Sequence, residues 1–338
     1  MLNSVTLKNF GTLKNVEWSN LGKINLVIGN NGCGKTFLLK ALYASIRTLE
    51  EYKRGDDKRS ESEILVDKLY WTFQPEKIGD LVTKKAETGL SCALQVDNKS
   101  FSFSFKEGTT KNISNLENDV PPRNSNSIFL PAKEVLSLHH IILKSREQDK
   151  VFGFDDTYFD LAKALRQPTT GGRNFKEFAK SRQELESILG GKIEYDENTN
   201  RWQFKKGNQK FPIGVTAEGI KKIAILDTLL GNRYLNTNSI IFIDELESAL
   251  HPTAISQLLD IIAVLADTGI QFFIASHSYF VIKKLFLIAQ EKKLSIPVMS
   301  SVNDEWNKYD LLAEMPANPI IDESVRLYKE EIELAFNE

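Results

Sequence analysis

Residues 25–39 read NLVIGNNGCGKTFLL, in which an apolar strand leads through a glycine-rich turn directly into a helix. The spacing G-x-x-x-x-G-K-T is typical of a phosphate-binding loop. Its glycines let successive backbone N–H groups point at phosphate oxygens, and the helix adds the positive end of its dipole. Lys35 is expected to reach the β- and γ-phosphates, and the Thr36 hydroxyl to occupy one Mg²⁺ coordination position. The residues predicted to contact the nucleotide in this loop are Gly29, Asn30, Asn31, Gly32, Cys33, Gly34, Lys35 and Thr36.

A second site is predicted at residues 239–245, which read SIIFIDE. The apolar run IIFI fits a strand buried on both faces, and the carboxyl ends of such parallel strands are where open α/β sheets bind ligands. Asp244 is the expected Mg²⁺ partner, directly or through water, and Glu245 is placed to polarise an attacking water. The alternative is that both acids only cap the helix that follows Pro252.

A third strand is expected at residues 270–275, and it ends in Ser276-His277-Ser278. At the end of a strand, His277 can hydrogen-bond a γ-phosphate oxygen or the attacking water. A purely structural histidine is the alternative. We therefore name Glu245 and His277 as the candidate catalytic residues.

The composition limits the class of protein. A chain of 338 residues with 41% hydrophobic residues can form one large domain or two lobes. The net charge of −2 argues against a general nucleic-acid coat but permits a local basic groove. We expect a cytoplasmic protein without membrane contact, because the sequence shows no apolar run near the length of a membrane span, no secretion signal and only two cysteines.

The rest of the chain reads as a mixed α/β pattern. Residues 2–18 alternate like an antiparallel pair of strands, whereas residues 107–127 read as a loop. A helix is expected to begin within residues 131–134, and residues 135–189 are mainly helical with an interruption at residues 168–172. A hairpin is expected within residues 192–204.

The last part of the chain predicts an edge strand at residues 295–300 and a second strand at residues 308–313. A final helix follows, with an apolar stripe at Val325, Tyr328, Ile332 and Phe336 among many acidic residues. This helix is expected either to dock onto its own domain or to bind a partner.

The three sites together resemble those of ABC-type P-loop ATPases, in the class that includes SMC proteins, RecF-like repair ATPases and the ATPase part of OLD-family defence proteins. The resemblance covers roughly residues 1–50 and 210–290. It implies an α/β ATPase head with a mostly parallel sheet, an N-terminal antiparallel β portion and an inserted helical lobe. The implied division is an N-terminal part of the head (1–130), a helical insertion (131–190), a C-terminal part of the head (191–290) and a C-terminal extension (291–338).

Other motifs of the family fall on particular residues. The segment SALHP, which begins at Ser248, stands where these ATPases carry the D-loop, and His277 matches the switch histidine. The best candidate for the signature motif is residues 215–222, VTAEGIKK, with Thr216 for the serine hydroxyl and Gly219 for close backbone approach. A plain helix N-cap is the alternative role for Thr216. Lys133 and Glu134 stand where the glutamine of the glutamine loop is expected.

The resemblance implies a homodimer that encloses ATP and Mg²⁺ at two shared sites and opens on hydrolysis, with a higher oligomer left open. ATP would then act as a switch for a separate effector protein, a nuclease or toxin, in anti-phage defence or a repair-like process, and direct nucleic-acid binding stays open. The first alternative is an ABC transporter subunit, against which stand ELESALHP, the missing glutamine and the large middle insertion. The second is a self-contained nuclease or toxin, against which stands the short segment after residue 290.

Overall fold

The structure is a computed structural model and describes residues 1–168, 176–303 and 305–336. A six-stranded sheet in the order β14-β13-β3-β12-β11-β7 runs through the molecule. Strand β14 is antiparallel to β13, and the other neighbours pair in parallel. The strands are β3 (Ile24–Gly29), β7 (Ile128–Leu130), β11 (Ile240–Asp244), β12 (Gln271–Ser276), β13 (Pro297–Val302) and β14 (Glu305–Asp310).

The register of this sheet brings the three predicted sites to one edge. Asp244 lies opposite Ala275, and Ser276 lies opposite Ile28, one residue before the phosphate loop. Strands β3, β11 and β12 are buried along their whole length, as their continuous apolar runs predict. Parallel strands end at the same edge, so residues distant in sequence converge there.

A second, five-stranded sheet in the order β2-β1-β4-β5-β6 is antiparallel and confirms the predicted N-terminal portion. Strand β6 lies in the stretch predicted to be a loop. Its backbone pairs with β5, and the polar composition of the stretch gave no indication of this pairing. The strands are β1 (Leu2–Phe10), β2 (Leu13–Trp18), β4 (Leu90–Val96), β5 (Lys99–Phe105) and β6 (Asn115–Asn118).

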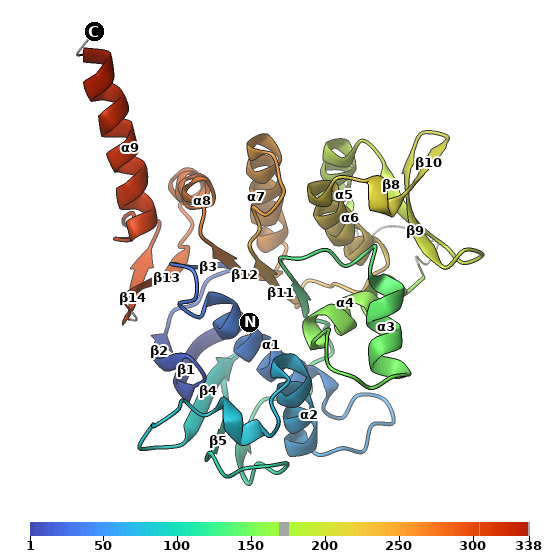
Figure 1. Cartoon of the computed structure of the whole chain (residues 1–338), viewed down its shortest axis with the longest axis vertical. Coiled ribbons are helices and arrows are strands. Elements are labelled where there is room, and N and C mark those ends of the chain that lie inside the picture. The colour runs from blue at the N-terminus through green and yellow to red at the C-terminus, as the bar shows by residue number, and fades with distance from the viewer. Residues whose placement is uncertain (169–175, 304, 337–338) are drawn as a thin grey trace.

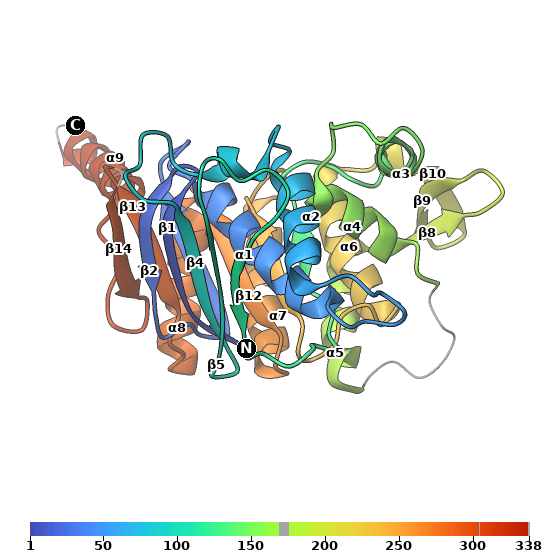
Figure 2. The ribbon, with the colours of Figure 1, turned by 90° about the horizontal axis from the view of Figure 1, so that it is seen from below.

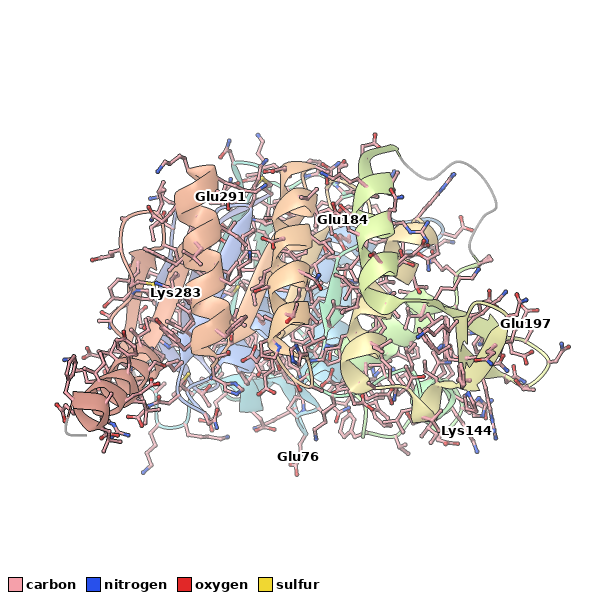
Figure 3. All side chains as sticks on the ribbon, turned by 90° about the horizontal axis from the view of Figure 1, so that it is seen from above. Glu76, Lys144, Glu184, Glu197, Lys283 and Glu291 are labelled. Carbon is pink, nitrogen blue, oxygen red and sulfur yellow. The ribbon has the colours of Figure 1, made fainter. Side chains whose placement is uncertain are left out.

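Helix α1 (Lys35–Glu51) lies between the two sheets, and its apolar residues share one core with the facing strands (Figures 1 and 2). Helix α2 (Glu61–Phe73) packs beside α1 and begins at a capping box formed by Ser60 and Glu63. Helices α7 (Pro252–Asp267) and α8 (Tyr279–Lys292) cover the other face of the six-stranded sheet (Figure 3). Residues Lys283 and Glu291, labelled on α8 there, are exposed. None of the described helices combines the length and the apolar character needed to cross a membrane.

The middle of the chain forms helices α3 (His139–Glu147), α4 (Asp156–Leu165), α5 (Lys176–Leu189) and α6 (Glu218–Gly231). The helix predicted to begin within residues 131–134 begins only at His139, because Glu134 accepts the backbone N–H of Ser137 and forms a local turn. From residue 169 on, the predicted interruption at 168–172 lies outside the described residues. The predicted hairpin forms β8 (Lys192–Asp196) and β9 (Arg201–Lys206), and β10 (Gln209–Pro212) extends it to three strands.

The C-terminal prediction was wrong about the sheet edge. Strand β13 lies inside the sheet, because β3 pairs with one side of it and β14 with the other. Val298 and Met299 pack on its two faces into two buried clusters. The edge strand is β14, three residues earlier than predicted. The predicted final helix is α9 (Pro319–Phe336), which projects from the body (Figure 1) and has no buried residue among those described.

Candidate functional site

The phosphate loop connects β3 to α1, and its backbone requires glycine. Gly34 caps α1 with a φ of 99°, and a Cβ there would lie 2.9 Å from the Thr12 Oγ1. The Lys35 side chain is 8% exposed, and its Nζ donates to the carbonyls of Gly29 at 2.8 Å and Asn30 at 2.9 Å. The first N–H groups of a helix lack intrahelical partners. An ammonium and free N–H groups therefore meet at the start of α1, which suits a polyphosphate.

The Thr36 hydroxyl lies against Asp244, 2.9 and 3.0 Å from its two carboxylate oxygens. Burial raises the pKa of Asp244, and the neighbouring Glu245 adds to this. The hydrogen bond from Thr36 and the positive charges of Lys40 and Lys35 partly oppose that rise. A hydroxyl and a carboxylate side by side are the oxygen donors that Mg²⁺ prefers, so this pair fits a hydrated magnesium ion.

A cavity of about 670 Å³ opens beside this pair and has room for a bound nucleotide. Several of its lining residues were not singled out from the sequence, because they come from α2, α4 and the β1–β2 turn. The cavity is lined by Thr12, Asn31, Gly32, Gly34, Lys35, Thr36, Phe37, Lys40, Thr72, Phe73, Gln74, Asp155 and Glu245.

Glu245 follows β11 in the left-handed region, with a φ of 48°. Its backbone is held on both sides: its N–H donates to the Ala275 carbonyl at 3.0 Å, and its carbonyl accepts from Lys222 Nζ at 2.9 Å. Burial lowers the pKa of Lys222, although the negative charges of the surrounding acids, Glu247 first among them, oppose this shift. The Glu245 carboxylate lines the cavity and is 41% exposed. This geometry places a partly exposed carboxylate next to the space where a terminal phosphate would lie.

His277 lies beside Glu245, as its predicted role requires. Its Nδ1 is 3.9 Å from a Glu245 oxygen and 3.5 Å from a Glu247 oxygen. Glu247 was missed from the sequence, although it stands two residues after Glu245. It accepts hydrogen bonds from the Ser276 hydroxyl at 2.9 Å and the His277 N–H at 3.0 Å. Glu247 therefore ties the end of β12 to the loop after β11.

Thr216, Gly219 and Ser248 do not line this cavity. Ser248 lines a separate cavity of about 310 Å³, beneath the segment that leads out of β11. Gly219 packs against the same segment, since a Cβ there would lie 2.6 Å from the Ala249 carbonyl oxygen. The alternative role of Thr216 as an N-cap was wrong, because Ala217 occupies that position and its side chain cannot accept a hydrogen bond.

Two family models match the sequence. The model described as "AAA domain, putative AbiEii toxin, Type IV TA system" matches residues 97–283, and the model described as "AAA ATPase domain" matches residues 1–150. A protein named ATP/GTP phosphatase from Helicobacter pylori (strain ATCC 700392 / 26695) is 22% identical over 347 residues, which cover 86% of this chain and 89% of that protein.

Solved structures of SMC heads share the fold. The SMC head bound to the C-winged helix domain of ScpA has a TM-score of 0.53 at 11% identity and covers 91% of this chain and 97% of its own. An SMC head with an extended coiled coil, bound to the C-terminal domain of ScpA derived from Pyrococcus furiosus, has a TM-score of 0.50 at 10% identity and covers 97% and 98%. The two family models confirm the predicted ATPase, and the SMC heads confirm the predicted fold. Because the first model matches more than half of the chain, the protein belongs to the family described as "AAA domain, putative AbiEii toxin, Type IV TA system", and it is an ATPase.

Proposed function

We propose that this ATPase dimerises around Mg²⁺-bound ATP and acts as a switch for a separate effector protein, in anti-phage defence or a repair-like process in the cytoplasm. The observation that carries the proposal is the contact of Thr36 with Asp244 beside Lys35 and Glu245, around one cavity. Within it, Lys35 and the loop N–H groups bind phosphates, Thr36 and Asp244 hold the metal, and Glu245 and His277 orient water. The magnesium ion would neutralise phosphate charge during transfer.

The proposal of an ATP-enclosing dimer is supported by the position of the signature and D-loop residues outside the nucleotide cavity of their own chain. Thr216 and Ser248 are partly exposed and Gly219 is buried against Ala249, and none of the three lines the nucleotide cavity of the same chain. A second copy that presents Thr216, at the start of its signature segment, and Ser248 would complete the site around the terminal phosphate. The ATP state would then set the distance between the two copies.

The proposed effector surface includes the helical insertion (131–190) and the C-terminal extension (291–338). Helix α9 has large apolar side chains exposed on it, among them Leu327 at 53%, Tyr328 at 63% and Leu334 at 71%. The same helix carries more acids than bases. An exposed amphipathic helix of this kind suits a protein partner with apolar and basic side chains.

Two substitutions test the chemistry. Lys35→Ala is expected to abolish ATP binding, because it removes the charge that meets the phosphates. Glu245→Gln is expected to retain ATP but lose most turnover, and the protein should accumulate as an ATP-bound dimer by light scattering. Turnover at the wild-type rate in Glu245→Gln would remove that residue from the role.

A mixing experiment tests the ATP-enclosing dimer. Thr216→Asp is expected to block completion of the partner's site, since it adds a negative charge near the terminal phosphate from a partly exposed position. A mixed dimer of Thr216→Asp with Lys35→Ala retains one site without either substitution. ATPase activity should therefore recover on mixing, and no recovery in confirmed mixed dimers would count against sites shared between copies.

A further inference from the structure

Lys133 and Glu134, which stand where the glutamine loop is expected, do not reach the nucleotide cavity. Glu134 turns away from the phosphate loop: its Oε1 accepts the Ser137 N–H at 2.8 Å and lies 3.7 Å from Lys221 Nζ on α6. Lys133 and Glu134 both line the 310 Å³ cavity and neither lines the nucleotide cavity. Another element therefore lines the nucleotide cavity in place of this segment.

The element is the N-terminus of α4. Asp155 is the N-cap of this helix and lines the nucleotide cavity together with Thr36 and Glu245. One of its oxygens accepts the Thr157 N–H at 2.8 Å, which fixes the cap. The other lies 2.6 Å from Lys40 Nζ. The side chain is 13% exposed, so the carboxylate is held in place at the wall of the cavity.

Lys40 connects Asp155 to the magnesium side of the site. It stands one helical turn after Thr36 on α1, so the two side chains share a face. Thr36 in turn hydrogen-bonds both carboxylate oxygens of Asp244, at 2.9 and 3.0 Å. The Lys40–Asp155 ion pair and the Thr36–Asp244 contact therefore come from neighbouring turns of α1, and Thr36, Lys40 and Asp155 all line the nucleotide cavity.

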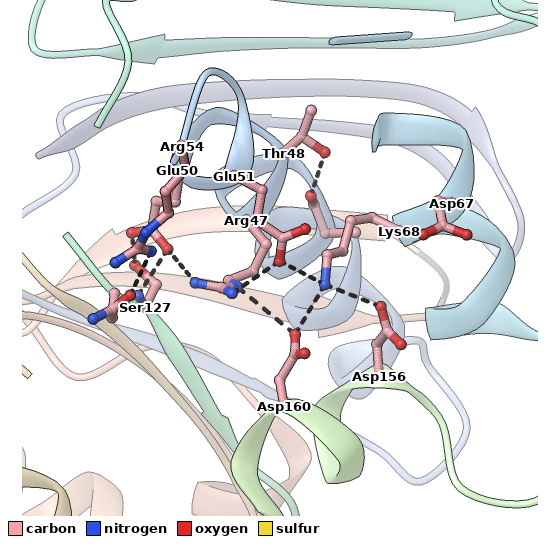
Figure 4. Close-up of polar contacts among 12 residues, drawn as sticks. Arg47, Thr48, Glu50, Glu51, Arg54, Asp67, Lys68, Ser127, Asp156 and Asp160 are labelled. Carbon is pink, nitrogen blue, oxygen red and sulfur yellow. Dashed lines mark hydrogen bonds and ion pairs between the residues drawn. The ribbon is translucent and has the colours of Figure 1, made fainter. Parts of the chain in front are cut away.

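Helix α4 is fixed to α1 and α2 behind this contact. Asp160 accepts a hydrogen bond from the Tyr43 hydroxyl of α1 at 2.7 Å. Lys68 Nζ of α2 donates to Asp160 at 3.1 Å and lies 3.2 Å from Asp156 (Figure 4). Lys40 and Tyr43 lie on one face of α1, three residues apart. The carboxylate of Asp155 is thus preorganised relative to the phosphate loop.

We propose that Asp155 is a further nucleotide-site residue, through which the helical insertion contacts the water shell of the bound magnesium ion. The inference rests on the proposed function of the phosphate loop. Magnesium keeps several waters when it binds to phosphates and one or two protein oxygens, and those waters donate to nearby carboxylates. A carboxylate held on the wall of the cavity that Thr36 also lines serves that purpose, and Lys40 balances its charge in the absence of metal.

The test compares nucleotide affinity with and without the metal. Asp155→Asn keeps a good N-cap and removes the charge. For a non-hydrolysable ATP analogue in Mg²⁺, the variant should bind about tenfold more weakly than wild type, the loss expected for one charge-assisted hydrogen bond. In EDTA it should bind equally or more tightly, because a negative charge near the phosphates is gone. Asp155→Ser, which also caps the helix, should behave alike.

The matched control is Asp260→Asn, which removes a 2.7 Å ion pair with Lys284 between α7 and α8, away from the site. It should leave both affinities unchanged. The assignment would be overturned if the Asp155 variants lost affinity equally in Mg²⁺ and in EDTA, or if neither Asp155→Asn nor Asp155→Ser lost affinity in Mg²⁺. Lys35→Ala distinguishes a failure of the phosphate-loop assignment from a failure of the role of Asp155. If Lys35→Ala abolishes binding while both Asp155 variants bind like wild type, only the role of Asp155 fails. If Lys35→Ala binds normally, the phosphate-loop assignment itself is wrong.

Discussion

The buried ion pairs behind the nucleotide site make a quantitative prediction for Asp160→Asn. The Asp160 carboxylate is buried and accepts a hydrogen bond from the Tyr43 hydroxyl. It also accepts from Lys68 Nζ and lies 3.7 Å from Arg47 Nε (Figure 4). Burial by itself would raise the pKa of Asp160, but the charges of Lys68 and Arg47 outweigh burial and lower it to about 2. Replacing this carboxylate by an amide removes the charge that these cations require, while the shape of the side chain stays nearly the same.

The lowered pKa sets the scale. The difference between 3.8 and about 2 corresponds to roughly 2–3 kcal/mol of folding free energy, at about 1.36 kcal/mol per pKa unit. This agrees in size with the cost of breaking a buried ion pair, about 3–5 kcal/mol. Asp160→Asn should therefore lower the free energy of unfolding by about 2–4 kcal/mol at pH 7.

Urea unfolding followed by tryptophan fluorescence measures the loss. A lowered carboxyl pKa contributes stability that is present above the unfolded value of 3.8 and is lost as the pH falls toward 2. The difference between variant and wild type should be equal at pH 7 and pH 5 and shrink below about pH 4. The control Asp67→Asn breaks an exposed 3.0 Å pair with Arg59 and should cost less than about 0.5 kcal/mol. A loss for Asp160→Asn no larger than the control's would refute the reasoning.

Three further outcomes are expected. Gly219→Ala should slow turnover on the order of tenfold to a hundredfold, because the added Cβ displaces Ala249 and the loop behind Glu245; an unchanged turnover number would contradict the packing. Glu247→Gln should slow turnover roughly tenfold with ATP affinity retained, since its two charge-assisted hydrogen bonds weaken; equilibrium binding and steady-state rates separate the two effects. The purified chain should not cleave plasmid, single-stranded DNA or tRNA with Mg²⁺ or Mn²⁺, because the described residues hold no further metal-binding group of acids, histidines or cysteines; cleavage that persists in Glu245→Gln would reveal a second active site.

The local sequence determined the parts of the site that one short segment can encode. The phosphate loop needs one strand, one glycine turn and one helix start, so residues 25–39 carry it completely. The runs IIFI before Asp244 and FFIA before Ser276 are apolar because both faces of those strands are covered, so the composition of the sequence reveals them. The class of ATPase followed from these motifs.

Tertiary structure alone decided which distant side chains join them. Asp155 and Lys40 meet although 115 positions separate them in the sequence, where each resembles an ordinary surface charge. Glu134 follows the expected strand, yet a local turn directs it toward α6. The polar strand β6 forms because β5 offers its free backbone edge, and β13 lies inside the sheet because α8 returns the chain beside β3. Such contacts depend on the docking of whole elements, which local propensity does not encode.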